Sequence, residues 1–398
     1  MIYVNGLNPC SMEVGSTHPT AMYINGRLVY QCTEQPPFDW GNQYFGTRSL
    51  ADGTEFRIYD RTGGGWGDGL ILENFLVSYD YGQTWLQPTL VQGQQTYIYA
   101  SADRGKLVMW KNVGRISWHY TYQGESMSRH IIITATQPFE ALGNILALRF
   151  GDDFRENTDT QLESYEFEQI FSVNGSPLQK ADNLIIPSSS IPASGCNMMF
   201  NGCANLVSPP ALPATSIGNG AYYRMFAGCT SLSSAPSLPA TTLSQGCYER
   251  MFIGCTSLSS APSLPVTAVT QRCYYRMFED CTSLVNAPQL PAPTLAQDCY
   301  YAMFSGCTAL TGATLGVTDF SVNRPLGCCH YMFNGCSSLT YLSCTATNPS
   351  SDYTWYWVRD VASTGLFVKK YGVDWNVASP NRYAGIPENW TVVNDSLP

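Results

Sequence analysis

The chain has 398 residues, enough for two or three domains that each bury a core of their own. Charged and aromatic residues each make up 13%, beside 34 glycines and 24 prolines, which is typical of a folded, turn-rich β or solenoid protein rather than a disordered one. A net charge of −9 without a lysine and arginine cluster argues against nucleic acid as a partner, and no apolar run approaches the ~18 residues that membrane insertion needs.

The first residues, MIYVNGLNPCSMEVGS, lack a basic start followed by an apolar segment, so they do not match a secretory signal. We therefore expect folding in a cytoplasm, where thiols stay reduced. Residues 1–45 form the first predicted unit. Within them AMYINGRLVYQ predicts a β-hairpin, because Asn25-Gly26 suits a tight turn between two alternating strands.

Residues 46–155 predict an antiparallel β-sandwich, because short β-branched or aromatic runs alternate there with turns. Its tryptophans are expected to fill the core rather than bind a ligand: Trp66, Trp85, Trp110 and Trp118. The glycine-rich segment 62–70 is not followed by Gly-Lys-Ser/Thr and predicts a loop rather than a phosphate site. GDDFREN at 151–157 lacks the ligand spacing of a known calcium loop and predicts a solvated acidic turn.

Residues 156–185 are expected to form a capping helix and linker before the repeat region. Thr160 and Glu163 have capping-box spacing, and the apolar residues Leu162, Phe167, Ile170 and Phe171 lie mostly on one face of a helix. The exposed end of a repeat stack needs such a cover. The sequence therefore predicts a helix that caps the first coil.

Residues 186–345 are a repeat with a strict period of 26 over its first five copies. A Met-Phe pair falls at 199/200, 225/226, 251/252, 277/278, 303/304 and then 332/333. A unit of this size cannot bury its own apolar face, so it must stack on its neighbours. We expect about six coils, with a strand at segments such as TSLSSAP and a helical turn at CYERMF.

Cysteines recur in the repeat, in four coils as pairs eight residues apart. A disulfide would require both members, yet the coil that ends in Cys229 has Ala221 at the partner position. Alanine and cysteine are both small core fillers, so packing is the preferred interpretation. The alternatives are a zinc site at Cys328, Cys329, His330 and Cys336, or a catalytic cysteine activated by a histidine. We predict no metal, no cofactor and no catalytic residue.

Residues 346–398 contain WYWVRDVASTGLFV and GIPENWTVV, which are expected to close the stack with aromatic side chains and an edge strand. The predicted fold is therefore mainly β, with an N-terminal sandwich, a solenoid and a C-terminal cap at 346–398.

The repeat pattern Cys-Tyr-x-x-Met-Phe-x-Gly-Cys-Thr-Ser-Leu followed by Ala-Pro-x-Leu-Pro-Ala-Thr resembles the BspA-like class of leucine-rich repeats. GNILALRFGDDF before the repeats and the segment after them resemble the flanks of such repeats in proteins of gut anaerobes and their phages. The resemblance implies a non-enzymatic phage virion protein, a head or tail fibre or receptor-binding protein, that assembles in the host cytoplasm. It implies contact with other virion proteins through the N-terminal region and with a host surface protein or glycan through the repeats.

A candidate recognition face consists of variable residues that follow each Cys-Tyr or its equivalent: Tyr223, Arg224, Glu249, Arg250, Tyr275, Arg276 and Tyr301. A scaffold role is the competing interpretation, since tyrosine recurs in nearly every coil. Two other functions stay open. One is a bacterial cell-surface adhesin, and the other is a glycan depolymerase with paired carboxylates among Asp60, Asp68, Glu73 and Asp80. A homo-oligomer is among the possible assemblies, although the sequence contains no heptad stretch of the kind that trimerises a fibre.

Overall fold

The computed structural model describes residues 21–24, 27–31, 44–60, 72, 74–91, 97–113, 119–122, 125–128, 131–155, 162–186, 189–321, 325–377 and 384–395. The chain divides into two compact units, Met1–Trp40 and Gly41–Pro398. In the first unit, β1 (Ala21–Ile24) pairs antiparallel with β2 (Arg27–Gln31). The predicted hairpin is confirmed, although its Asn25-Gly26 turn lies outside the described residues.

The second unit begins with two sheets, of strand order β11-β4-β7-β6 and β13-β12-β3-β8-β5. Apart from the pair β12 and β13, these strands run antiparallel to their neighbours, which confirms the predicted sandwich. A separate hairpin joins β9 (His119–Tyr122) to β10 (Glu125–Ser128). The strands of the sheets are β3 (Phe45–Ser49), β4 (Thr54–Asp60), β5 (Phe75–Ser78), β6 (Thr89–Val91), β7 (Tyr97–Ala102), β8 (Leu107–Asn112), β11 (Ile131–Ala135), β12 (Phe139–Asn144) and β13 (Leu178–Ile185).

The sandwich core follows the two-residue period of the strands. In β4, Phe56 and Ile58 are fully buried, whereas Arg57 between them is half-buried. Trp110 is fully buried as predicted, and its indole N–H donates to the Thr47 hydroxyl at 2.9 Å. Trp85 is only half-buried, and Lys111 Nζ lies over its ring at 4.4 Å from the centroid. Trp66, Trp118 and segment 62–70 lie outside the described residues.

The sandwich is joined to the coils through β13. After β12 the chain forms α1 (Ala147–Phe150) and a short 3-10 helix at Gly151–Arg155, and β13 then returns parallel to β12. On its other side β13 meets the next coil, where the Ala181 N–H donates to the Ser208 carbonyl at 2.7 Å. Over its described part the predicted acidic turn at 151–157 is this 3-10 helix, and Asp152 and Asp153 are exposed to solvent as expected. Asp152 accepts from Lys111 Nζ at 2.7 Å and from the Tyr44 hydroxyl at 2.5 Å.

The predicted capping helix is wrong for the described part of its segment, residues 162–171. Residues 164–171 form turns, and the N–H groups of Phe167, Gln169 and Phe171 donate across to residues 195, 197 and 199 of the next coil at 3.0 Å. Gln169 has a left-handed φ of 59°, which a continuous α-helix excludes. The apolar side chains are buried as expected, but this segment is the first coil of the stack rather than a helix that covers it.

Each coil is held to the next by alternate backbone hydrogen bonds. The N–H groups of Tyr222, Arg224 and Phe226 donate to the following coil at 2.9 to 3.0 Å, whereas the N–H of Tyr223 donates three residues back to Gly220. This chain of turns replaces the helical turn predicted at CYERMF. The segments predicted as strands make isolated parallel bridges, such as Ser234 with Ser260. Two coils pair through β14 (Ser190–Ile191) and β15 (Ser216–Ile217).

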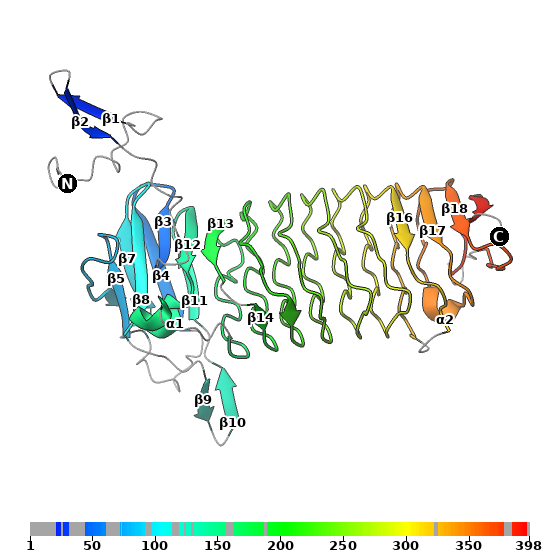
Figure 1. The fold of residues 1–398 in the computed structure, drawn as a ribbon, viewed down its shortest axis with the longest axis horizontal. Helices are drawn as coiled ribbons and strands as arrows, with labels where there is room; N and C mark the ends of the chain where they lie inside the picture. The colour runs from blue at the N-terminus through cyan, green and yellow to red at the C-terminus, as the bar shows by residue number, and fades with distance from the viewer. Residues whose placement is uncertain are drawn as a thin grey trace. The chain divides into compact units, whose positions relative to one another are not determined.

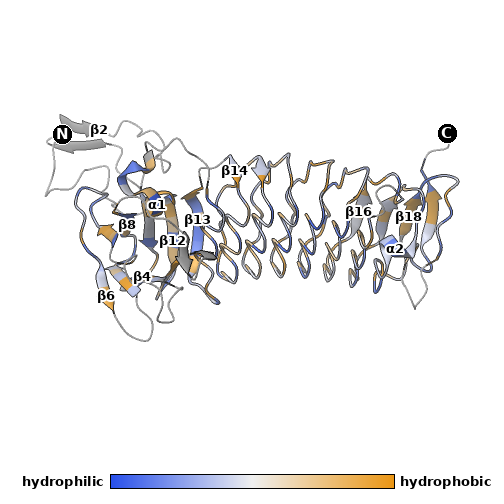
Figure 2. Ribbon diagram, turned by 90° about the horizontal axis from the view of Figure 1, so that it is seen from below, coloured by the Kyte–Doolittle hydropathy of each residue, from blue (hydrophilic) through white to orange (hydrophobic). Residues whose placement is uncertain are grey.

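A ladder of stacked phenylalanine rings runs through the centre of the coils. Adjacent rings lie 5.3 to 5.7 Å apart with interplanar angles of 1 to 7°: Phe171, Phe200, Phe226, Phe252, Phe278, Phe304 and Phe333. Trp357 follows at 6.2 Å. The solenoid therefore has about eight coils, two more than the sequence repeat indicated. Figure 1 shows these coils side by side, and Figure 2 shows apolar and polar residues alternating along each of them.

The last coils carry a parallel sheet of order β16-β17-β18-β19. Its strands are β16 (Gly312–Leu315), β17 (Tyr341–Cys344), β18 (Leu366–Lys369) and β19 (Thr391–Asn394), and α2 (Ser351–Thr354) precedes β18. Trp357 stacks on Trp375 at 5.5 Å and donates its indole N–H to the Gly385 carbonyl at 2.8 Å. The predicted aromatic closure and edge strand, β19, are confirmed. The described part of the chain contains no helix of the length and hydrophobicity needed to cross a bilayer.

Glu166 in the first coil makes the stability depend on pH. The residue is 1% exposed, its Oε2 lies 2.7 Å from Arg149 Nη1, and burial raises its pKa to about 7. The folded-state pKa of Glu166 exceeds the unfolded value of about 4.3, so folding is favoured when the carboxyl is protonated. This contribution to the free energy of unfolding is fully present below about pH 4 and is lost as the pH rises to about 7. Between pH 5 and 7, we expect the free energy of unfolding to fall by about 2 kcal/mol more in the wild type than in Glu166→Gln, measured by urea denaturation.

Asp182→Asn is the control for this measurement, since Asp182 is an exposed carboxylate on β13. This variant should keep the pH profile of the wild type. Parallel profiles for the wild type and Glu166→Gln would contradict the assignment.

Candidate functional site

The cysteines of the repeat are core residues. All thirteen cysteines that the structure describes, from Cys196 to Cys344, are buried with free thiols. In six coils the thiol lies 3.0 to 3.2 Å from a phenylalanine carbonyl of the preceding coil, as between Cys255 Sγ and the Phe226 oxygen. Ala221 is likewise fully buried. These contacts support the packing interpretation.

The environment of these thiols also disfavours nucleophilic chemistry. Burial raises the pKa of Cys203, Cys255 and Cys336 to about 12, so the reactive thiolate is negligible at neutral pH. His330 Nε2 lies 2.9 Å from the Asp352 backbone oxygen, and burial lowers the pKa of its ring. Among the described residues, no three His, Cys, Asp or Glu side chains are grouped to hold a metal.

We expect the native protein to be nearly inert to thiol reagents. At pH 8 a chromogenic disulfide reagent should titrate at most two thiols, from Cys10 and Cys32, which lie outside the described residues, and all fifteen in urea. The variant Cys10→Ser/Cys32→Ser should show none in its native state. Rapid reaction of further thiols in that variant would contradict the burial of the cysteine columns.

Of the four acidic residues considered for a depolymerase, the structure describes the side chain of Asp80. Asp80 lies in the turn after β5, where its carboxylate accepts hydrogen bonds from Thr84 and Ser78. These bonds, above all that from the Thr84 hydroxyl, lower its pKa to about 2. The side chains of Asp60, Asp68 and Glu73 lie outside the described residues. Asp80 therefore has a structural role as an acceptor in its turn.

The predicted recognition residues lie in two columns that cross the coils, which we name the tyrosine–arginine stripe. The columns are paired by backbone hydrogen bonds, as from Arg224 N–H to the Glu249 oxygen and from Arg250 N–H to the Tyr275 oxygen. The first column contains Tyr223, Glu249, Tyr275, Tyr301, His330 and Trp355, and the second contains Arg224, Arg250, Arg276, Ala302, Tyr331 and Tyr356. Except for the buried Glu249 and Ala302, these residues are half-buried or exposed.

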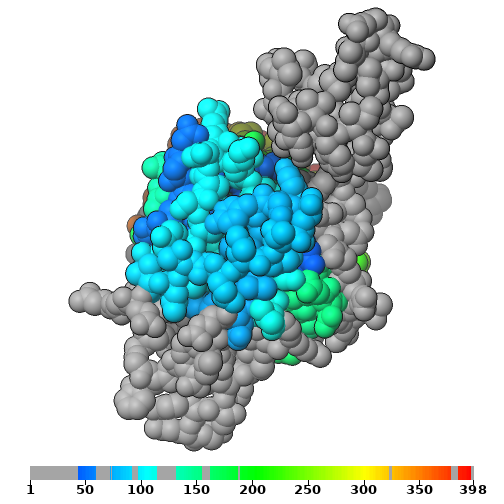
Figure 3. All heavy atoms as spheres, turned by 90° about the vertical axis from the view of Figure 1, so that its left-hand side faces the viewer, coloured from blue at the N-terminus to red at the C-terminus, as the bar shows by residue number. Residues whose placement is uncertain are grey.

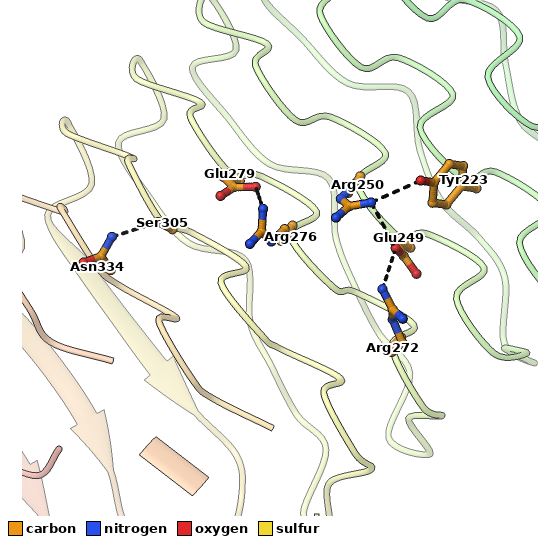
Figure 4. A network of polar contacts seen from close by, with 8 residues as sticks. All are labelled: Tyr223, Glu249, Arg250, Arg272, Arg276, Glu279, Ser305 and Asn334. Atoms are coloured by element: carbon orange, nitrogen blue, oxygen red, sulfur yellow. Dashed lines mark hydrogen bonds and ion pairs between the residues drawn. The ribbon is translucent and has the colours of Figure 1, made fainter. Parts of the chain in front are cut away.

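Polar contacts connect the stripe from coil to coil, as Figure 4 shows. Arg250 Nη1 donates to the Tyr223 hydroxyl at 3.1 Å and lies 3.5 Å from Glu249 Oε1. Arg272 Nη2 binds the same carboxylate oxygen at 2.9 Å. In the same coil as Arg272, Arg276 Nη1 pairs with Glu279 Oε2 at 3.3 Å.

Tyr275 is the centre of this network. The guanidinium carbons of Arg272, Arg250 and Arg276 lie 4.3, 5.4 and 5.6 Å from the centroid of its ring, within the range of cation–π attraction. The ring of Tyr301 stacks on it at 4.7 Å with an interplanar angle of 12°. The structure thus brings together six of the seven predicted residues, whereas in the described part of the chain Arg224 makes no side-chain contact with them.

Sequence reasoning missed the continuation of the stripe. Tyr331 stacks on Tyr356 at 5.3 Å, and Trp355, which is 40% exposed, lies 4.9 Å from Tyr356. His330 lies edge-on to Trp355 at 5.8 Å. Counting back from the Met-Phe pair at 332/333 would have placed His330 and Tyr331 in the columns despite the longer spacing before that pair.

The left-handed backbone of the second column is a requirement of the scaffold. Arg224, Arg250 and Arg276 have φ of 52 to 56°, a strained conformation for a residue with a side chain. Met198 and Ala302 adopt the same conformation at the equivalent positions, with φ of 52 and 50°. The strain therefore accompanies every such turn and does not identify a functional residue.

The chain was compared with known proteins in three ways. No family model, no curated protein and no solved structure matches it.

Proposed function

We propose that this protein is a non-enzymatic recognition protein of a phage virion, a head or tail fibre or a receptor-binding protein. In this proposal the tyrosine–arginine stripe contacts a glycan or protein on the host surface, and the N-terminal region contacts other virion proteins. The observation that carries it is the row of tyrosine, arginine and tryptophan side chains that recur at the solvent-accessible positions of successive coils from Tyr223 to Tyr356, interrupted by the buried Glu249 and Ala302.

The composition and rigidity of the stripe support recognition. Tyrosine, tryptophan and arginine are the residue types that dominate the energy of binding surfaces. Backbone hydrogen bonds between coils hold each position, and ring stacking fixes side chains such as Tyr275 and Tyr301. A surface that is ordered before binding loses less conformational entropy on association. The stripe therefore has the properties of a preorganised binding face.

The sandwich offers a surface suited to attachment. Tyr79, Tyr81 and Leu86 between β5 and β6, and Leu90 in β6, are large apolar residues exposed by 49, 63, 55 and 37%. A hollow of about 440 Å³ lies beside them, lined by Leu72, Gln87, Pro88, Leu90 and Ile98. Figure 3 views the sandwich from the end opposite the coils, where the described atoms are mainly in the light-blue to cyan range. Exposed apolar patches on soluble proteins mark contact surfaces.

The phage setting rests on the resemblance of the repeats and their flanks to BspA-like proteins, and particle composition tests it. Mass spectrometry of purified virions should detect the chain in stoichiometric amounts with the major structural proteins. If the chain is absent from virions and present in the cell-surface fraction of a bacterium, the virion proposal is wrong and the protein is a bacterial adhesin.

A further inference from the structure

The positive charge of the solenoid is concentrated on and beside the stripe. From Ala181 to Val368 the sequence contains no lysine and six arginines, and four of these lie in three adjacent coils: Arg224, Arg250, Arg272 and Arg276. The whole chain carries a net charge of −9. A local cluster of this kind attracts anions over about a Debye length, although the molecule as a whole repels them.

The arginines are the outer groups of this cluster and the carboxylates are the inner ones. The side chains of Arg272, Arg276 and Arg250 are exposed by 37, 32 and 25%, whereas those of Glu249 and Glu279 are exposed by 10 and 15%. Three guanidinium groups face two carboxylates, and each guanidinium has five N–H donors. Hydrogen-bonding capacity for a further oxyanion therefore remains on the solvent side.

The spacing of the stripe identifies the kind of chain that would carry this oxyanion. Between neighbouring coils, the stacked rings of Tyr275 and Tyr301 are 4.7 Å apart, and the rings of Tyr301 in the first column and Tyr331 in the second, tilted by 49°, are 5.6 Å apart. A pyranose unit adds a similar length to a polysaccharide. In an extended peptide the side chains on one face repeat at roughly 6.6 Å, which does not match the coils.

We propose that the stripe binds an acidic glycan, with a carboxylate or phosphate group held by Arg250, Arg272 and Arg276 around Tyr275. This inference rests on the proposed recognition function and names its ligand class. The planar guanidinium groups bind an oxyanion through paired N–H donors. Sugar rings on either side of the anion lie along the aromatic side chains of the stripe, from Tyr301 towards Trp355.

The test compares immobilised polymers with the full-length protein in biolayer interferometry. Polygalacturonate presents carboxylates, its fully methyl-esterified form presents the same backbone without charge, phosphorylated dextran presents phosphates on a pyranose chain, and polyglutamate presents carboxylates on a peptide chain. We expect binding to polygalacturonate or phosphorylated dextran at least tenfold tighter than to the methyl ester. The charged glycan that binds more tightly shows whether the arginines prefer a carboxylate or a phosphate. Binding to it should weaken as the NaCl concentration is raised from 50 to 500 mM.

Two variants assign this binding to the cluster. Arg272→Gln/Arg276→Gln should weaken binding to the preferred polymer at least tenfold, while Arg104→Gln, at an exposed arginine of the sandwich, should leave it unchanged. Circular dichroism checks that both variants are folded.

Three results would overturn the inference: equal binding to the methyl ester, tighter binding to polyglutamate, or no binding to any of the four polymers. Host cells tested in parallel separate the two proposals. Binding to cells together with any of these three results leaves the recognition function standing, and absence of binding to both cells and polymers rejects both.

Discussion

Replacing Phe252 with alanine is expected to destabilise the solenoid by about 3 to 5 kcal/mol. The ring is fully buried between Phe226 at 5.5 Å and Phe278 at 5.6 Å, with interplanar angles of 7 and 1°. Its removal leaves a cavity that two neighbouring rings border, and the regular backbone hydrogen bonds prevent the coils from closing it. Urea denaturation followed by circular dichroism measures the loss of free energy of unfolding.

The position of Phe252 in the middle of the stack increases the effect of the substitution. In a solenoid each coil contacts only its neighbours, so a weakened central interface separates two halves that must each be stable on their own. The control is Ile253→Ala, which shortens a half-buried side chain in the same coil and should cost less than about 1.5 kcal/mol. A loss below about 1 kcal/mol for Phe252→Ala would show that the ladder does not hold the coils together.

The fixed 26-residue spacing of the apolar residues predicted that the coils stack and bury these residues between them. Each Met-Phe pair is buried as the stacking argument requires, and the adjoining cysteines are buried with it. The coils at the two ends escaped detection because they lack the pair. The ladder requires an aromatic ring at the second position of the pair but no methionine at the first. In the first coil the pair is Ile170-Phe171, and in the later coil it is Tyr356-Trp357.

The helix predicted over 160–171 failed for a reason that no local pattern reveals. Its buried residues, such as Phe167 and Phe171, fit one face of a helix, but they equally fit a coil whose alternate N–H groups donate to a neighbour. The hydrogen-bond acceptors lie about 28 residues further along the chain. Periodicity within one segment cannot register such partners, so the tertiary arrangement overrides the local signal.

The residues of the candidate site that recur every 26 residues were predicted from the sequence. The residues that do not follow this period were missed. Tyr275 and Arg276 recur in phase, and the structure places them together with Tyr301. Arg272 occupies a corner at which other coils have Gly220 and Gly246, and it keeps their left-handed conformation with φ of 57°. An arginine in a glycine position is the signal that could have identified it.

The aromatic side chains of the stripe are expected to provide most of the affinity for the host surface. Trp355 is exposed, and Tyr275 and Tyr301 are held by stacking, so these residues contribute contact area with little loss of side-chain freedom. Truncation of aromatic anchors at the centre of an interface costs about 2 kcal/mol or more each. We therefore expect Tyr275→Ala/Tyr301→Ala/Trp355→Ala to lower the affinity of the full-length protein for host cells at least a hundredfold, or about 2.7 kcal/mol.

Flow cytometry of host cells with fluorescently labelled protein measures this loss, and Tyr371→Ala is the matched control. Tyr371 is 52% exposed in the last coil but lies outside both columns of the stripe, so its removal should leave the affinity within a factor of two. Unchanged binding by a folded triple variant would mean that the stacked tyrosines only stabilise the scaffold and that another surface meets the host. A similar loss in Tyr371→Ala would instead indicate that the C-terminal end of the solenoid is the recognition site.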